Sequence, residues 1–288
     1  MFTREKVLLA LLDRAGGGMS RTRLVKLAFF FAQENPDYPA GAVYQFVPYR
    51  FGPFSFTLYH ELERLAQAGA VSVASGRLLR PGGNAGGRAW TLEARVSEAV
   101  DRVYRRYGGL STPSLIEAAY TQYPWYMLKS DRIEKRAVRP QAGERKVYTA
   151  GYEGRQVDGF LALLLRHGIE VLLDVRANPV SRRYGFHRNT LARICRRLGL
   201  EYRHLPEVGV PSEWRVDLGT DGSHSALFRR YEREILPARE DVIRQIARSM
   251  QDKPAVLVCY EADVRLCHRS RLARAVSLMS GLEICDLG

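Results

Sequence analysis

Long apolar runs, cysteine and lysine are all scarce in this chain of 288 residues. The longest apolar runs, such as residues 160–165 and 255–260, fall far short of the roughly 18 residues that a membrane-spanning helix needs. This pattern excludes a helical membrane protein, and we expect no membrane partner. Residues 1–6 are charged and carry no small-residue cleavage site, so we also expect no signal peptide and a cytoplasmic location.

The four cysteines, Cys195, Cys259, Cys267 and Cys285, all lie in the second half of the chain. Their spacing is not typical of a zinc site, and we expect them to be free thiols. We interpret Cys259 and Cys267 as small buried packing residues. We therefore expect neither a metal ion nor another cofactor.

Lysine supplies only six of the 44 cationic residues, which leaves 38 arginines and a formal net charge of +13. The planar guanidinium suits phosphate, although an arginine-rich genome would produce the same bias. Residues 1–140 contain 20 cations and 12 anions, and residues 141–288 contain 24 cations and 19 anions. Both halves could therefore face a polyanion, and we expect nucleic acid, in particular double-stranded DNA, as the partner.

The first half of the chain is predicted to form helices and one short β-ribbon. Apolar residues at helical spacing predict a helix over residues 3–14, a second helix that Ser20 caps, and a third that ends near Gly69. Residues 70–74 and 88–92 have the pattern of two short strands around a glycine-rich segment. Three helices and a β-ribbon indicate a mainly α, winged-helix-like domain.

Winged helices often bind duplex DNA, with one helix in the major groove and basic side chains of the wing on the backbone. A winged helix that binds a protein partner is the alternative. The second helix and the wing offer six basic side chains for DNA, namely Arg21, Arg23, Lys26, Arg77, Arg80 and Arg88.

Three segments of this half carry a family resemblance, namely Lys26-Leu27-Ala28-Phe29-Phe30, Tyr49-Arg50-Phe51-Gly52-Pro53-Phe54 and Leu58-Tyr59-His60-Glu61-Leu62. With these motifs, residues 4–125 resemble the antitoxin-associated Panacea domain. The resemblance implies binding, to DNA or to a protein partner, rather than catalysis.

An aromatic group closes the N-terminal domain, which we expect to span residues 1–128. Its members are Tyr123, Trp125 and Tyr126. They are interpreted either as a packing plug between domains or as a platform or wedge for unstacked bases. The polar and charged residues 129–145 that follow are predicted to be a linker.

The second half, residues 146–288, alternates strands and helices. Strands are predicted over residues 146–150, 171–175, 201–205 and 255–259, with helices between them and after the last. This alternation implies right-handed crossovers and an α/β fold, with a doubly wound, mostly parallel sheet and helices on both faces.

Polar residues follow each of these strands, and the carboxyl ends of parallel strands share the edge of the sheet where ligands bind. The candidate catalytic residues are Glu153, Asp174, Glu261, Tyr152 and His268. The candidate substrate-binding residues are Arg176, Arg182, Arg183, Tyr260, Arg269 and His187. A structural ion pair between Asp174 and Arg176 is the alternative to a functional role for either.

Four motifs at these strand ends occur in order, namely Gly151-Tyr152-Glu153-Gly154, Asp174-Val175-Arg176 with Ser181-Arg182-Arg183, Tyr202-Arg203-His204-Leu205-Pro206, and Cys259-x-Glu261 with Cys267-His268-Arg269. With these motifs, residues 146–288 resemble the domain-of-unknown-function family numbered 488. The resemblance implies a fold and a set of strand-end residues rather than a known reaction. Residues 208–212 depart from the Leu-Gly-Gly-type turn that is usual in the family.

We favour cleavage of an N-glycosidic bond, by a DNA glycosylase that flips and excises a base. This reaction uses carboxylates beside phosphate-binding arginines and needs no metal ion. A metal-dependent nuclease is an alternative, although the arginines would compete with the metal ion for the carboxylates. A non-enzymatic regulator of the antitoxin type is another alternative. The pairing of an antitoxin-like domain with a nucleic-acid enzyme also suggests the hypothesis of a role in anti-phage defence.

A cysteine phosphatase or a rhodanese-like enzyme is the last alternative. Cys259 and Arg265 have the Cys-x5-Arg spacing of cysteine phosphatases, and residues 173–176 resemble a rhodanese strand. Glu261 and Asp263 disfavour it, because a loop that cradles an anion should carry no negative charge.

Overall fold

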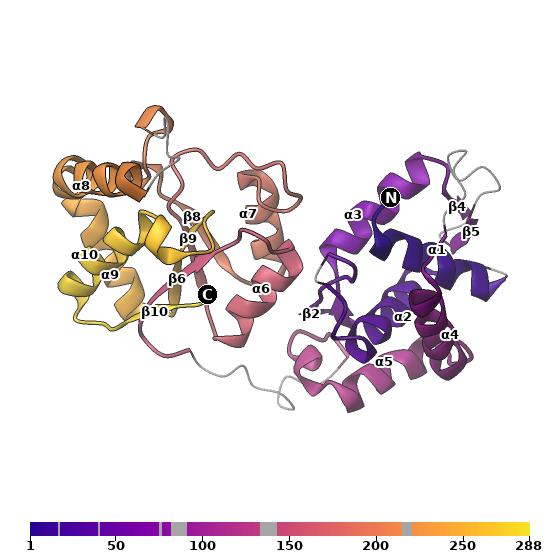
Figure 1. Ribbon diagram of the computed structural model, residues 1–288. Helices are drawn as coiled ribbons and strands as arrows, with labels where there is room; N and C mark the ends of the chain where they lie inside the picture. Colours follow the sequence, from indigo (N-terminus) through magenta and orange to yellow (C-terminus); the bar gives the residue numbers. More distant parts are fainter. Residues whose placement is uncertain (17, 40, 75–76, 82–90, 133–142, 215–220) are drawn as a thin grey trace. The chain divides into compact units, whose positions relative to one another are not determined.

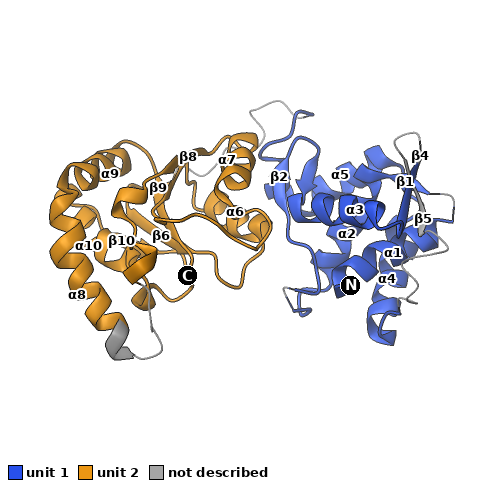
Figure 2. Cartoon of the chain, turned by 90° about the horizontal axis from the view of Figure 1, so that it is seen from above, with its two compact units in different colours: residues 1–139 blue, residues 140–288 orange. Residues whose placement is uncertain are grey.

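The chain folds into two compact units, Met1–Arg139 and Pro140–Gly288 (Figure 2). The computed structural model describes residues 1–16, 18–39, 41–74, 77–81, 91–132, 143–214 and 221–288 (Figure 1). No helix within these ranges is both long and apolar enough to cross a membrane.

The N-terminal unit is mostly helical, as the sequence predicts. Its helices are α1 (Thr3–Ala15), α2 (Arg21–Glu34), α3 (Phe56–Gln67), α4 (Ala94–Tyr107) and α5 (Thr112–Gln122), followed by the short 3-10 helix η1 (Pro124–Met127). Its strands are β1 (Met19–Ser20), β2 (Val47–Tyr49), β3 (Gly52–Phe54), β4 (Val71–Ala74) and β5 (Arg77–Pro81). Three helices begin at a serine whose hydroxyl accepts a backbone N–H of the first turn, and these serines are Ser20, Ser55 and Ser111.

A three-stranded antiparallel sheet, in the order β1-β5-β4, completes the winged-helix arrangement. The sequence led us to pair residues 70–74 with residues 88–92, and this part of the prediction is wrong. Thr91 and Leu92 belong to no strand, and residues 88–90 lie outside the described residues. The pairing of β4 with β5 is favoured because a short hairpin loop costs less entropy than a long one, and because β5 also pairs with β1.

Aromatic rings fill the core of this unit, and the predicted aromatic group belongs to it. The ring of Phe29 lies 5.1 Å from the ring of Tyr123 and 4.8 Å from that of Tyr126, measured between centroids. Tyr126 is buried, and Tyr123 and Trp125 pack, partly buried, against the same core. These contacts agree with a packing role for the aromatic group, but the packing lies within the unit and not between domains. Because Tyr126 is buried, the expectation that it stacks on bases is wrong.

Two of the basic side chains that we assigned to DNA serve inside the unit instead. Lys26 is 2% exposed, and its Nζ donates to the carbonyl oxygen of Pro53 at 2.7 Å. The guanidinium of Arg23 donates to two carbonyl oxygens in the turn between α4 and α5. The assignment of these two to DNA is therefore wrong, because their charged ends already bind backbone oxygens. Of the other four, Arg21 is half-buried at the start of α2, and the side chains of Arg77, Arg80 and Arg88 lie outside the described residues.

Burial lowers the pKa of Lys26 from 10.5 to about 7. Between these two pH values the unfolded chain binds more protons than the folded chain, so stability should rise with pH over this window. We expect a rise of roughly 3 kcal/mol between about pH 7 and pH 9.5, measured by denaturant unfolding of the full chain. Lys26→Met should abolish the rise and Lys6→Met, in the same unit, should not. A wild-type free energy of unfolding that stays constant between about pH 7 and pH 9.5 would contradict the lowered pKa of Lys26.

The C-terminal unit alternates strands and helices, which confirms the predicted α/β class. Its strands are β6 (Val147–Gly151), β7 (Val171–Asp174), β8 (Glu201–His204), β9 (Ala255–Cys259) and β10 (Ile284–Asp286). Its helices are α6 (Val157–Arg166), α7 (Arg188–Arg197), α8 (Asp221–Ala238), α9 (Glu240–Asp252) and α10 (Arg269–Ser280). Short 3-10 helices are η2 (Pro206–Val208), η3 (Ser212–Trp214) and η4 (Val264–Leu266).

These five strands form one parallel sheet in the order β10-β6-β9-β7-β8. Helices α6 and α7 lie on one side of the sheet, and α8, α9 and α10 lie on the other (Figures 1 and 2). Every residue of the central strand β9 is buried, as expected for a parallel strand covered on both faces. The predicted doubly wound arrangement is confirmed.

Two elements of this unit differ from the prediction. β10 was missed because it is a short edge strand with two exposed residues, so its sequence contains no buried run. The helix expected over residues 225–250 is two helices, α8 and α9. α8 ends at Ala238, directly after Pro237, whose ring disfavours continuation of a helix.

The register of the sheet brings three strand ends to one edge. Gly151 of β6 lies opposite Cys259 of β9, and Asp174 of β7 lies opposite Val258 of β9. The residues that follow these strands therefore emerge close together, at the edge where open α/β sheets bind their ligands.

Candidate functional site

A pocket of about 460 Å³ lies at this edge of the sheet. Its walls come from the segments that follow β6, β7 and β9 and from the loop around η3. Three arginines, two tyrosines and one cysteine line it, namely Arg176, Arg182, Arg183, Tyr152, Tyr260 and Cys259. Among the described residues, no carboxylate lines this pocket. The structure thus brings together five of the predicted site residues and adds Cys259.

Asp174, a candidate catalytic group, is instead the centre of a buried ion pair. Arg176 donates to its two oxygens, from Nε at 2.7 Å and from Nη2 at 2.5 Å. The hydroxyl of Tyr202 donates to Oδ2 at 2.6 Å, and Asp174 is fully buried. The structural ion pair that we gave as the alternative is therefore present, and it disfavours a catalytic role for Asp174, because its oxygens face protein donors.

Arg176 is the other half of this pair. Burial lowers the pKa of Arg176, but the hydrogen bond and the charge of Asp174 outweigh burial and raise the pKa above its ordinary value. Its Nη1 donates to the hydroxyl of Tyr152 at 2.7 Å and to the carbonyl oxygen of Phe186 at 3.0 Å. Arg176 lines the pocket, but its guanidinium is engaged and the residue is only 4% exposed, which disfavours its assignment to substrate phosphate.

Aromatic rings form a second wall of the pocket. Tyr152 stacks on Phe186, with ring centroids 4.1 Å apart and planes 9° apart. The ring of Tyr260 stands edge-on to Tyr152 at 5.4 Å and is 40% exposed. Burial raises the pKa of Tyr152, which keeps its hydroxyl protonated at neutral pH. Tyr260 therefore presents an accessible ring to a planar group that enters the pocket.

The exposed cations of the pocket are Arg182 and Arg183, in the loop between β7 and α7. Nη1 of Arg183 donates to the carbonyl oxygen of Arg155 at 3.3 Å, which leaves further donors of this guanidinium facing solvent. His187, which we also assigned to substrate, is exposed at the N-cap of α7 and does not line the pocket. Arg182 and Arg183 are therefore the cations of the pocket lining that could meet an anion from solvent.

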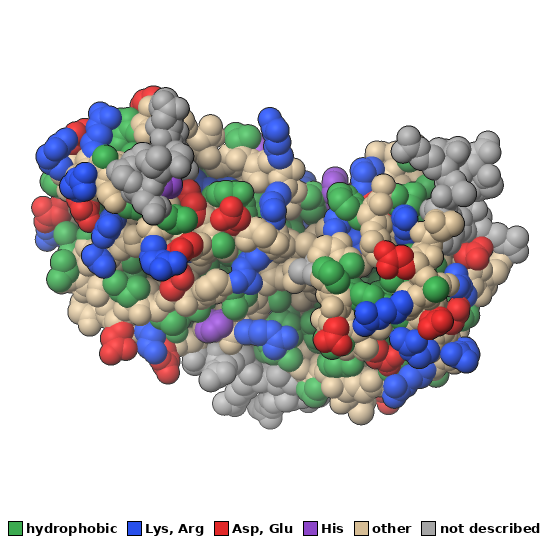
Figure 3. All heavy atoms as spheres, in the orientation of Figure 1, with side chains coloured by type: hydrophobic (Ala, Val, Ile, Leu, Met, Phe, Trp, Pro, Cys, Tyr) green, Lys and Arg blue, Asp and Glu red, His purple; other side chains and the backbone are tan. Residues whose placement is uncertain are grey.

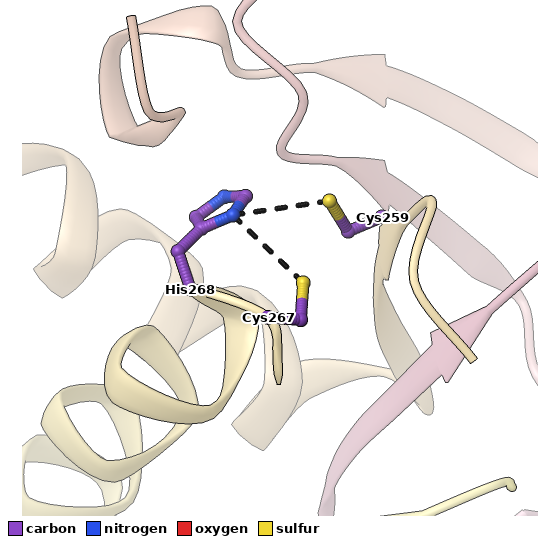
Figure 4. Close-up of side chains that lie close together, drawn as sticks. All are labelled: Cys259, Cys267 and His268. Carbon is purple, nitrogen blue, oxygen red and sulfur yellow. Dashed lines mark hydrogen bonds between the residues drawn. The ribbon is translucent and has the colours of Figure 1, made fainter. Parts of the chain in front are cut away.

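Cys259, Cys267 and His268 form a buried cluster beside the pocket (Figure 4). Cys259 ends β9, and the other two directly precede α10. Nδ1 of His268 lies 3.8 Å from each sulfur, and Nε2 lies 3.1 Å from the carbonyl oxygen of Val175. Each of the three side chains is at most 2% exposed. The burial of both cysteines agrees with their interpretation as small buried packing residues, and in addition both sulfurs lie close to His268.

The two thiols of this cluster differ in acidity. The hydrogen bond between Cys267 and Cys259 holds the pKa of Cys259 well below its ordinary value, although burial opposes it. Burial and the neighbouring Cys259 raise the pKa of Cys267 well above its ordinary value. Cys259 is therefore the more acidic thiol of the pair.

The turn after β9 carries Glu261 and is held from several sides. Arg269 is fully buried and donates to the carbonyl oxygens of Glu261 and Ala262. Oε2 of Glu153 accepts the backbone N–H of Ala262 at 3.0 Å. Gly151 approaches so closely that a Cβ there would lie 1.8 Å from the carbonyl oxygen of Glu261. Arg269 thus positions the turn, and its assignment to a substrate phosphate is wrong.

Among the three candidate carboxylates, Glu261 is the one that lies beside Cys259 of the pocket wall. Its Oε2 lies 3.1 Å from the sulfur of Cys259, and its side chain is partly exposed. Glu153 is exposed and accepts a hydrogen bond from the turn, and Asp174 is enclosed by its ion pair. The three carboxylates therefore differ in exposure and in their partners, which the sequence alone does not show.

The loop from Tyr260 to Leu266 does not form the anion cradle of a cysteine phosphatase. Arg265, the cation of the Cys-x5-Arg spacing, has a side chain that is 85% exposed and paired with Asp263. The backbone N–H of Arg265 donates to the same carboxylate, and that of Ala262 donates to Glu153. The backbone N–H groups of Ala262 and Arg265 thus already donate to carboxylates of the protein, which further disfavours a cysteine phosphatase.

Some residues of the site were missed in the sequence. Asn178 and Ser212 line the pocket, and neither was predicted as a site residue. The Cys259, Cys267 and His268 cluster was also missed. A signal for the cluster was present, because a cysteine at a strand end and a Cys-His pair at the next helix start lie one short loop apart.

Comparison with known proteins supports one of the two resemblances. Residues 156–276 match the model of a family described as domain of unknown function DUF488. This stretch contains β7, β9, the pocket arginines and the cysteine cluster. The resemblance inferred from the strand-end motifs is confirmed for these residues, and the Panacea resemblance of residues 4–125 stays a prediction. No curated protein and no solved structure matches the chain.

Proposed function

We propose that the C-terminal unit is a nucleic-acid hydrolase that takes one nucleotide into the pocket. The observation that carries this proposal is the composition of the pocket wall, where Arg182 and Arg183 stand beside the accessible ring of Tyr260. Guanidinium groups bind phosphate, and an aromatic ring stacks on a base. Enzymes that act on a base within a duplex flip that base into such a pocket.

The bond that we propose for cleavage is the N-glycosidic bond, and Glu261 is the proposed general base. This reaction needs a carboxylate that activates water or stabilises a cationic sugar. Glu261 contacts the pocket residue Cys259, whereas the oxygens of Asp174 are held by Arg176 and Tyr202. A magnesium nuclease is less favoured, because a magnesium site built from these acids would have to take Asp174 from Arg176.

The place of duplex binding is proposed to be the wing of the N-terminal unit rather than α2. Arg23 and Lys26 of α2 are bound within the unit, while β4 and β5 form the hairpin that a wing requires. On the face that Figure 3 shows, the described lysine and arginine side chains lie among acidic ones. On that face, charge therefore does not mark a DNA surface, and a protein partner for this unit is the alternative.

Incubation of the protein with plasmid and with modified phage DNA tests the proposed reaction. Treatment with alkali should reveal abasic sites, and mass spectrometry should detect the released base. Nicks without abasic sites would indicate a nuclease instead, and unchanged DNA with retained binding would indicate the regulator. A role in anti-phage defence predicts reduced plating of at least one phage on cells that express the protein.

The pocket arginines should set affinity through phosphate contacts. Arg182→Ala combined with Arg183→Ala should weaken binding of an oligonucleotide and reduce the slope of log K against log salt by about 1 to 2. Fluorescence anisotropy at several salt concentrations measures both. The double variant Arg230→Ala with Arg233→Ala, on α8 and outside the pocket lining, is the control and should keep the wild-type slope. Equal slopes for all three proteins would place the phosphate contacts elsewhere.

A further inference from the structure

The buried cluster beside the pocket has the chemistry of a metal site. Its three ligand atoms, two sulfurs and one imidazole nitrogen, all lie within 4.8 Å of one another. Zn–S bonds of about 2.3 Å and Zn–N bonds of about 2.1 Å at tetrahedral angles place sulfur and nitrogen about 3.6 Å apart. The two S to Nδ1 distances here are both 3.8 Å. The two distances from sulfur to nitrogen are thus close to those of a tetrahedral zinc site.

The orientation of His268 supports the same conclusion. Its Nε2 faces the carbonyl oxygen of Val175 at 3.1 Å, an atom that only accepts hydrogen bonds. Nε2 therefore carries the proton, and in the neutral imidazole Nδ1 presents its lone pair to the sulfurs (Figure 4). Histidines that bind zinc are held in this way, with the second ring nitrogen donating to a carbonyl or carboxylate oxygen.

We propose that Cys259, Cys267 and His268 bind one Zn²⁺ ion, and that its fourth position takes a water molecule on the pocket side. Two thiolates and an imidazole suit zinc better than magnesium or calcium. Catalytic zinc sites have three protein ligands and one open position, whereas structural sites have four protein ligands. The sequence-based expectation of no metal ion would then be wrong.

The position of Glu261 gives this water a role, and this step rests on the proposed function. Glu261 lies beside Cys259 and is not required as a zinc ligand. Zinc enzymes with a His-Cys-Cys site also use a glutamate that does not bind the metal, as general acid and base. Glu261 accepts a proton from the water, and the hydroxide forms the new bond to C1′ of the sugar. The bond from C1′ to the base breaks, its electron pair leaves with the base, and Glu261 returns the proton to the base nitrogen.

Metal analysis of the full-length protein tests the site without reference to activity. The protein, purified with a reductant and dialysed, should contain about one zinc ion per chain by plasma mass spectrometry. Cys267→Ser and His268→Asn should each weaken zinc binding by more than about 100-fold, because a lost ligand should exceed the 10- to 100-fold effect of a lost outer-shell partner. Cys195→Ser, at another buried cysteine, and Cys285→Ser should keep the ion.

Cobalt gives a second measurement that does not depend on the folding of a variant. Wild-type protein loaded with Co²⁺ should show the strong absorption bands of a tetrahedral site with thiolate ligands. A wild type that takes up no zinc or cobalt after full reduction would overturn the proposal, as would a Cys259 to Cys267 disulfide that persists in its place. Zinc binding without any hydrolysis of DNA would support the zinc site and reject the proposed function. Hydrolysis of DNA by a protein that binds no zinc would support the proposed function and reject the zinc site.

Discussion

Asp174→Asn should destabilise the C-terminal unit by about 3 to 5 kcal/mol, because it removes the negative charge from a buried ion pair and leaves the guanidinium of Arg176 uncompensated. The pair is nearly inaccessible, with side chains that are 0% and 5% exposed. The hydrogen bond from Tyr202 would also lose its charged acceptor. Urea unfolding followed by far-UV circular dichroism measures the change.

The chain supplies a matched control for this variant. Asp263 and Arg265 form an ion pair with the same Asp-x-Arg spacing, but the arginine is 85% exposed and the aspartate 35%. Asp263→Asn should leave the unfolding midpoint nearly unchanged, because solvent screens an exposed pair. Similar losses of stability in both variants would show that burial is not the reason for the cost at Asp174. Loss of activity in Asp174→Asn should accompany unfolding rather than precede it.

Glu261→Gln should lower the rate of product formation by at least about 100-fold, the lower end of what a general base contributes. Glutamine keeps the size of the side chain but accepts no proton at neutral pH. Affinity for the oligonucleotide should stay within a factor of about 2, since the proposed phosphate contacts come from Arg182 and Arg183. Single-turnover kinetics together with fluorescence anisotropy separate the two effects.

Glu153→Gln is the corresponding control. The carboxylate of Glu153 accepts the backbone N–H of Ala262, and the amide oxygen of glutamine can accept the same hydrogen bond. This variant should therefore retain most of the rate. If Glu261→Gln is fully active while Glu153→Gln is not, the base is Glu153 and our assignment of Glu261 is wrong.

The parallel sheet was predictable because its inner strands are buried on both faces. Such strands appear in the sequence as short continuous apolar runs, as in residues 171–175 and 255–259, and helical periodicity separates them. The edge strand β10 has no such run, and it was missed. The wing was assigned to the wrong partner strand because pairing depends on the contact with β1 as well as on strand propensity.

The region of the site was predictable from the strand ends, but the roles of its residues were not. The sequence places Asp174 and Arg176 at the edge of the sheet, yet it does not show that their side chains turn towards each other and towards Tyr202. The approach of Cys259 to Cys267 and His268 depends on the path of the intervening loop. That path is set by contacts distant in the sequence, such as the close approach of Gly151 to the turn after β9.

The central position of β9 determines when this site can come into existence. β6 and β7 are translated early, but they do not pair with each other, because β9 lies between them in the sheet. During synthesis both strands must wait, with unpaired edges, until residues 255–259 leave the ribosome. Sequence separations of this size slow folding and expose a chain to aggregation. The strand that closes the sheet also delivers Cys259, so a truncated chain would have neither the assembled sheet nor the cluster.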